Sequence, residues 1–133
     1  MTTSEMTTSE ISAVRDVLRR SYTAWAAQDA DAFAALYTED ATVVLRGMFH
    51  HGREAVRAFM KDAFAGRLKG TRGVDDPQDI RIVGGDTAIV VSRAGFLMPG
   101  EEAVPADRAV LATWVLAKVD GDWLVTAYAN TPA

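Results

Sequence analysis

The spacing of apolar residues changes near residue 73, and this change restricts the fold more than any other feature of the chain. Before it, apolar side chains such as Ile11, Val14 and Leu18 recur at helical spacing. After it, runs rich in β-branched residues flank Gly84-Gly85-Asp86 and Asp120-Gly121, which are typical of tight hairpin turns. Helices followed by long antiparallel strands predict an α+β domain, with the helices packed on one face of a curled sheet.

Local signals predict three helices and several strands. Residues 7–10, Thr-Thr-Ser-Glu, fit a capping box for the first helix, and Asp29 is a suitable N-cap for a second, shorter helix. Residues 50–54 lead into a third helix, which we expect to end near Gly70. The expected strands cover residues 41–45, 80–83, 87–96, 108–119 and 123–128.

Length and composition restrict the class of protein. We expect a flexible tail over residues 1–8 and one domain over residues 9–133. The net charge of −4 and the lack of a strongly basic stretch argue against nucleic-acid binding. No apolar run approaches the ~18 residues needed to cross a bilayer, and the first ten residues lack the features of a signal peptide. A cytoplasmic protein without a membrane partner is therefore predicted.

Cofactor motifs are not found in the sequence. The chain has no cysteine, which excludes disulfides and thiolate metal sites. It also has no phosphate-binding glycine loop, no dinucleotide fingerprint and no spaced set of metal-ligating side chains. We therefore expect neither a metal nor a cofactor.

Four segments together carry a family resemblance. They are YTAWAAQD at residues 22–29, LYTEDATV at 36–43, HGREAV at 51–56 and DGDWLV at 120–125. In this order they resemble the nuclear-transport-factor-2-like superfamily over about residues 9–131. The similarity is closest to the SnoaL-like group, and within it to the SgcJ/EcaC type.

The resemblance implies a fold and a range of functions. The fold is a cone, in which a curved antiparallel sheet wraps around three N-terminal helices as in a cystatin-like α+β barrel, with a pocket at the wide end. Members often dimerise through the outer face of the sheet. They include cofactor-free isomerases, cyclases and dehydratases as well as binding modules, and some belong to polyketide and enediyne antibiotic pathways. Fold alone therefore does not decide the function.

The superfamily's ketosteroid isomerases need an acidic base and two donors on the enolate oxygen. The resemblance places these roles at Leu45, Ser21 and Thr113. Leucine cannot accept a proton, and neither hydroxyl replaces a strongly polarised acid. This chain is therefore not expected to be an isomerase of that type.

Aromatic residues from segments that should converge are candidates for the pocket wall. Buried tyrosines need a polar partner, so they are better candidates than phenylalanine. Asn130 ends the last strand, where its amide either orients a ligand or bonds to nearby backbone. The predicted ligand-binding residues are Ser21, Tyr22, Trp25, Tyr37, Phe59, Thr113, Tyr128 and Asn130.

Two residues are weak catalytic candidates, His51 and Asp107. His51 either acts as a base or merely caps the third helix, and Asp107 is either a pocket acid or a solvated strand end. His50 and His51 point to opposite faces if they lie in a strand, so they do not easily share a metal. Arg46 and Arg93 either anchor an acidic ligand or lie at the surface.

Trp114 and Trp123 are predicted to lie on the outer face of the sheet, because their parity is opposite to that of Thr113 and Asn130. Large aromatic side chains exposed on a sheet suggest an interface. We therefore predict a homodimer through this face.

Three functional hypotheses remain, the third of which is an enzyme that uses His51 or Asp107 as its base. The first is a pocket protein of bacterial secondary metabolism that binds an apolar polyketide or polyene (enediyne-type) intermediate. It either only holds this molecule or assists a cofactor-free cyclisation, dehydration or isomerisation. The alternative is a non-catalytic dimeric module that docks on a partner biosynthetic enzyme.

Overall fold

The computed structural model describes residues 3–133, with side chains from Thr7 onward. The helices are α1 (Thr3–Ala26), α2 (Ala30–Ala34) and α3 (Arg53–Ala65), together with the single 3-10 turn η1 (Ala106–Arg108). The strands are β1 (Tyr37–Leu45), β2 (Met48–His51), β3 (Arg72–Val83), β4 (Thr87–Leu97), β5 (Val110–Val119) and β6 (Asp122–Pro132).

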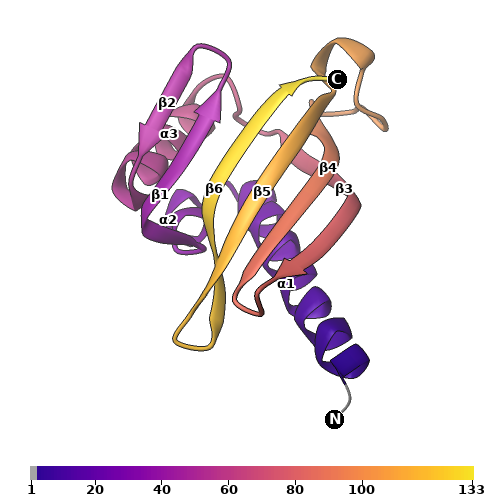
Figure 1. Ribbon diagram of the computed structural model, residues 1–133. Coiled ribbons are helices and arrows are strands. Elements are labelled where there is room, and N and C mark those ends of the chain that lie inside the picture. The colour runs from indigo at the N-terminus through magenta and orange to yellow at the C-terminus, as the bar shows by residue number, and fades with distance from the viewer. Residues whose placement is uncertain (1–2) are drawn as a thin grey trace.

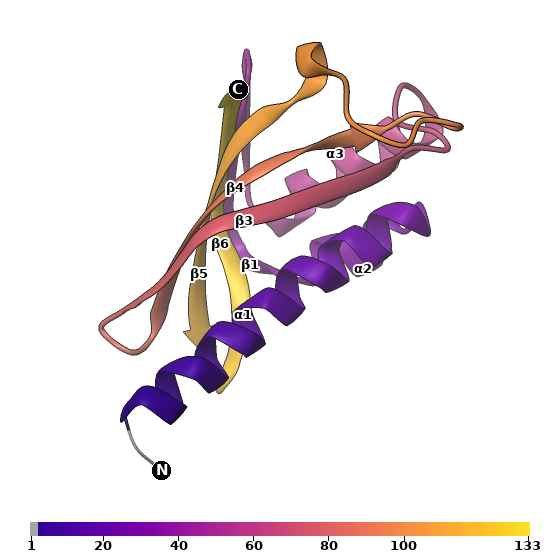
Figure 2. The same ribbon diagram turned by 90° about the vertical axis from the view of Figure 1, so that its right-hand side faces the viewer.

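The six strands form one curved sheet in the order β2-β1-β6-β5-β4-β3. All neighbouring strands are antiparallel except β1 and β6, which run parallel. Helices α1, α2 and α3 all lie on one side of the sheet, and no helix covers the other side in the part of the chain that the structure describes (Figures 1 and 2). The predicted α+β fold class is confirmed.

Helix α1 packs along the sheet through one apolar stripe. Val14, Val17 and Leu18 are almost completely buried, as the helical spacing of the sequence requires. The predicted capping box at residues 7–10 is wrong, because the helix already begins at Thr3. The Glu10 carboxylate instead accepts hydrogen bonds from Trp123 Nε1 at 3.0 Å and Lys118 Nζ at 3.1 Å. These bonds tie the first half of α1 to the β5–β6 hairpin.

The predicted N-cap of the second helix is confirmed. The Asp29 carboxylate accepts a hydrogen bond from the backbone N–H of Ala32 at 3.0 Å, which satisfies one of the free donors at the start of α2. The third helix ends at Ala65, earlier than the predicted end near Gly70.

Trp114 and Trp123 face the helices, so the prediction that they lie outside is wrong. Their exposed fractions are only 2% and 4%, whereas Thr113 is exposed. In β5 the alternation is regular, so Trp114 points inward and Thr113 outward. In β6, Val115 pairs with Ala127 and Leu116 with Val125, which leaves Thr126 as an extra residue in a bulge. The bulge shifts the alternation of β6, so that Trp123 before it and Asn130 after it both point inward.

Two strand boundaries were not anticipated. Strand β2 forms a short hairpin with β1, and β3 begins at Arg72 rather than near Ile80. Pro77 interrupts the strand pattern in the sequence, but β3 is the edge of the sheet, where a missing backbone N–H is tolerated. A register shift follows between Pro77 and Asp79.

Among residues 3–133, no helix combines the length and the apolar character that crossing a lipid bilayer requires.

Candidate functional site

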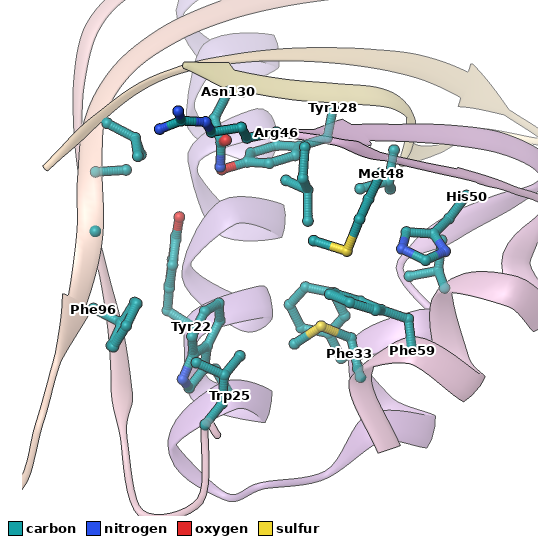
Figure 3. A pocket seen from close by; sticks show the side chains of 18 of the residues that line it. Tyr22, Trp25, Phe33, Arg46, Met48, His50, Phe59, Phe96, Tyr128 and Asn130 are labelled. Atoms are coloured by element: carbon teal, nitrogen blue, oxygen red, sulfur yellow. The ribbon is translucent and has the colours of Figure 1, made fainter. Parts of the chain in front are cut away.

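A cavity of about 320 Å³ lies between the concave face of the sheet and the three helices (Figure 3). This volume is at the lower end of the range found for small-molecule pockets. Most of the wall is aromatic or aliphatic. Its aromatic members are Tyr22, Trp25, Phe33, Tyr37, Phe59, Phe96, Trp114 and Tyr128. The polar and charged members are Arg46, His50, Arg67, Arg108 and Asn130.

Trp25 is the centre of the aromatic wall. Its indole Nε1 donates to the buried Thr71 hydroxyl at 3.0 Å, and Thr71 donates in turn to the carbonyl of Leu68 at 2.7 Å. The Trp25 ring lies 6.4 Å from both the Tyr22 and the Phe96 rings, measured between centroids. This fixed rotamer gives the cavity a rigid apolar wall that spans α1 and β4.

Gly73 lets these rings approach the edge strand. A Cβ atom at this position would lie 2.5 Å from Cδ1 of Tyr22 and 3.0 Å from Cδ2 of Trp25. Neither ring can move aside, because both pack against other aromatic side chains. The absence of a side chain at Gly73 therefore shapes this wall.

A partly buried carboxyl group, Asp75, lies behind Tyr22 and outside the cavity wall. Its oxygens accept hydrogen bonds from the Tyr22 hydroxyl at 3.1 Å and the Ser92 hydroxyl at 2.9 Å. Burial raises the pKa of Asp75 above its ordinary value, while the bonds from Ser92 and Tyr22 act in the opposite direction. Asp75 has no distinguishing signal in the sequence, because carboxylates are usually exposed and this one precedes the predicted strand.

Tyr128 and Asn130 form a second polar pair in the wall. The Asn130 amide donates to the Tyr128 hydroxyl at 3.0 Å. The Tyr128 ring packs edge-on against Trp114, with 4.6 Å between ring centroids. Burial raises the pKa of Tyr128 to about 12. The Trp114 Nε1 atom is buried and has no hydrogen-bond partner among the residues that the structure describes.

His50, and not His51, points into the cavity (Figure 3). Its ring lies 4.3 Å from that of Phe59, and its Nε2 atom is buried without a hydrogen-bond partner within the described part of the chain. His51 is exposed and stacks on Phe49 outside the cavity. The two histidines point in opposite directions because they are neighbours in β2.

Six of the eight predicted pocket residues line the cavity: Tyr22, Trp25, Tyr37, Phe59, Tyr128 and Asn130. Their contact with a ligand stays a prediction. Ser21 is fully buried and does not line the cavity, and its hydroxyl donates to the carbonyl of Leu18 at 2.7 Å. Thr113 points to the opposite face of the sheet, and Asp107 is exposed in η1. Neither Asp107 nor His51 therefore belongs to this cavity.

Arg108 anchors the loop between β4 and β5 beside the cavity. It pairs with Glu101 and donates to the carbonyl of Phe96 at 3.1 Å. Its guanidinium also lies 4.9 Å from the centre of the Phe96 ring. The bond from Arg108 lowers the pKa of Glu101 below its usual value. The guanidinium of Arg108 therefore already has partners within the protein, and these contacts stabilise the loop.

No cluster of three or more potential metal ligands is found in the described residues. The polar side chains of the cavity wall can form hydrogen bonds with a bound molecule.

The sequence matches the profile of the SnoaL-like domain over residues 18–126. The chain belongs to the SnoaL-like family. This match confirms the family predicted from the four sequence segments, without distinguishing the SgcJ/EcaC type. No curated protein matches the sequence significantly.

Solved structures share the fold. A domain of unknown function with a cystatin-like fold from Nostoc punctiforme PCC 73102 is 30% identical, with a TM-score of 0.86 over 96% of this chain and 79% of that one. A nuclear-transport-factor-2-like protein of unknown function from Shewanella oneidensis MR-1 is 20% identical, with a TM-score of 0.78 over 91% and 98% of the two chains. A third structure is that of a protein from Novosphingobium aromaticivorans DSM 12444, whose proposed identity is scytalone dehydratase. It is 18% identical, with a TM-score of 0.76 over 98% of this chain and 88% of that one. The last two show the fold alone.

Proposed function

We propose that this SnoaL-like protein binds an apolar small molecule, a polyketide- or polyene-derived intermediate of bacterial secondary metabolism, in the cavity under the sheet. The observation that carries the proposal is the cavity of about 320 Å³ with its largely aromatic wall. The polyketide and enediyne-type pathway rests on the sequence resemblance to the SgcJ/EcaC type. The cytoplasmic location and the limits of the domain stay predictions from the sequence.

His50 supports a catalytic version of this proposal. It lines the cavity, and its Nε2 atom has no partner in the described residues, so the imidazole is free to exchange a proton with a bound molecule. Cofactor-free dehydration, cyclisation and isomerisation all need such a transfer. The neighbour with scytalone dehydratase as its proposed identity favours dehydration among these reactions.

The uncovered face of the sheet supports a homodimer, although Trp114 and Trp123 take no part in it. Ile89, Val91, Val115 and Leu124 point to this face and are only partly buried, and Leu111 is 37% exposed. An apolar sheet face of this kind favours association with another copy. If the cavity binds nothing, docking of this face on a partner enzyme is the alternative function.

Native mass spectrometry of the purified protein tests the binding proposal. Under native conditions we expect a protein mass that includes a bound small molecule. Extraction with organic solvent should release this molecule as an apolar compound. Ala94→Leu, which adds volume at the cavity wall, should remove this mass, whereas Ala129→Leu on the exposed outer face should retain it. Retention of the same mass by both variants would place the compound elsewhere and contradict the proposal.

A further inference from the structure

The charged side chains that line the cavity are all of one sign. They are Arg46, Arg67 and Arg108, and no aspartate or glutamate lines it in the described part of the chain. This is unexpected from the composition, since the chain has 18 acidic residues against 14 lysines and arginines. Charges of one sign in a cleft with apolar walls act together and raise the local concentration of ligands with the opposite charge.

The three arginines are not equally available to a ligand. Arg108 already pairs with Glu101. Arg67 lies above the Phe59 ring, with its guanidinium 5.8 Å from the ring centre. Arg46 is exposed at the cavity wall, has neither an ion pair nor a side-chain hydrogen bond to any described residue, and lies just after β1, at the turn into β2. Arg46 is therefore the arginine with most hydrogen-bonding capacity left for a ligand.

Arg46 lies on the same side of the cavity as Asn130 and Tyr128 (Figure 3). The Tyr128 oxygen accepts the hydrogen bond from Asn130, so its own proton is left for another acceptor. The second N–H of the Asn130 amide and the guanidinium N–H groups of Arg46 are donors as well. This side of the cavity thus offers several donors, and a carboxylate, which only accepts hydrogen bonds, matches them.

The other side of the cavity suits the rest of an amphipathic molecule. Trp25, Phe33 and Phe59 line it, and Figure 3 shows them away from Arg46 and Asn130. On this evidence we propose that the ligand is an organic carboxylate with an apolar body, whose carboxylate binds Arg46, Asn130 and the Tyr128 hydroxyl. This inference rests on the proposed function, because it assigns the ligand class of the same cavity.

Isothermal titration calorimetry with decanoate and decanamide tests the inference. The two probes share a nine-carbon apolar chain and nearly the same head-group shape, but only decanoate is charged at pH 7.5. We expect decanoate to bind about tenfold more tightly than decanamide, as for charge-assisted hydrogen bonds to a partly solvated arginine. The preference should decrease as salt is added.

Two arginine variants locate the effect. Arg46→Gln should bind decanoate and decanamide with equal affinity, whereas Arg46→Lys should keep part of the preference. Arg93→Gln is the matched control, because Arg93 is exposed on the outer face of β4 and its loss changes the net charge equally. Circular dichroism confirms that each variant is folded.

The outcomes separate the two proposals. Equal binding of both probes to the wild-type protein would overturn the carboxylate inference, and so would an unchanged preference of Arg46→Gln for decanoate. Neither result would contradict the binding of an apolar molecule in the cavity. Failure of both probes to bind would instead overturn the proposed function, and the carboxylate inference with it.

Discussion

Single residues show how the cavity combines apolar walls with polar groups. Tyr22, Tyr37 and Tyr128 all line it; Tyr37 is buried, and the other two are partly buried. The sequence predicted these three residues correctly as cavity-lining, because a tyrosine in an apolar segment needs polar surroundings for its hydroxyl. Asp75 and His50 could not be selected in this way, since their burial depends on tertiary packing and on strand register.

Alkaline titration tests the burial of the tyrosines. Burial raises the pKa of Tyr22 and Tyr37 well above the usual value, and that of Tyr128 to about 12. The chain contains only these three tyrosines, so absorbance at 295 nm should show no tyrosinate up to about pH 11 in the native protein.

The folded state keeps the phenolic protons between about pH 10, where unfolded tyrosine ionises, and the higher folded pKa values. Stability is therefore complete below about pH 10 and falls as the pH rises through the folded pKa values. Tyrosinate absorbance should appear together with loss of structure by circular dichroism. Early ionisation of one tyrosine in a folded protein would show that its ring is solvated.

At the scale of elements, the positions of the hairpin turns could be predicted from the sequence, but the register of the strands could not. Asp120-Gly121 and Gly84-Gly85-Asp86 form the predicted hairpins, because positive backbone φ angles at these glycines are built into the turn. The bulge at Thr126 has no such signal. It lets Trp123 and Asn130 of β6 point to the same face although their positions have opposite parity, since one extra residue reverses every side chain beyond it. In β5 the alternation is regular, with Trp114 inward and Thr113 outward.

The contact between α1 and β3 depends on Gly73, and replacing it by alanine tests this. Gly73→Ala places a methyl group against the Tyr22 ring, so we expect a loss of about 1–3 kcal/mol in unfolding free energy by urea denaturation. Arg72→Ala is the control. It changes the exposed neighbour of Gly73 in the same strand, and should change stability by no more than about 0.5 kcal/mol. Equal effects of the two substitutions would argue against a tight contact at Gly73.

For the whole molecule, the order of helices and strands was sufficient to predict the layers. Amphipathic helices must bury their apolar stripes on a sheet, and the family resemblance supplied the curvature and the cavity. The other face of the sheet, carrying Val91, Leu111 and Val115, is left without a covering layer in the described residues. We propose that two copies of the chain associate through this face.

Sedimentation velocity tests the homodimer. The wild-type protein should sediment as a dimer at micromolar concentration, and Val115→Glu should sediment as a monomer because it puts a charge in the centre of the apolar face. Val83→Glu makes the same change at an exposed position next to the β3–β4 turn, and should remain dimeric. A monomeric wild-type protein would rule out the proposed association.

Calorimetric binding of decanamide at several temperatures is the most direct test of the central claim that the cavity takes an apolar molecule. We expect one saturable site per chain and a negative heat-capacity change, which marks the burial of apolar surface. Ala94→Phe, which fills the cavity from β4, should abolish binding, while Ala129→Phe on the outer face of β6 should preserve it. No binding to the wild-type protein, or equal binding to both variants, would contradict the account.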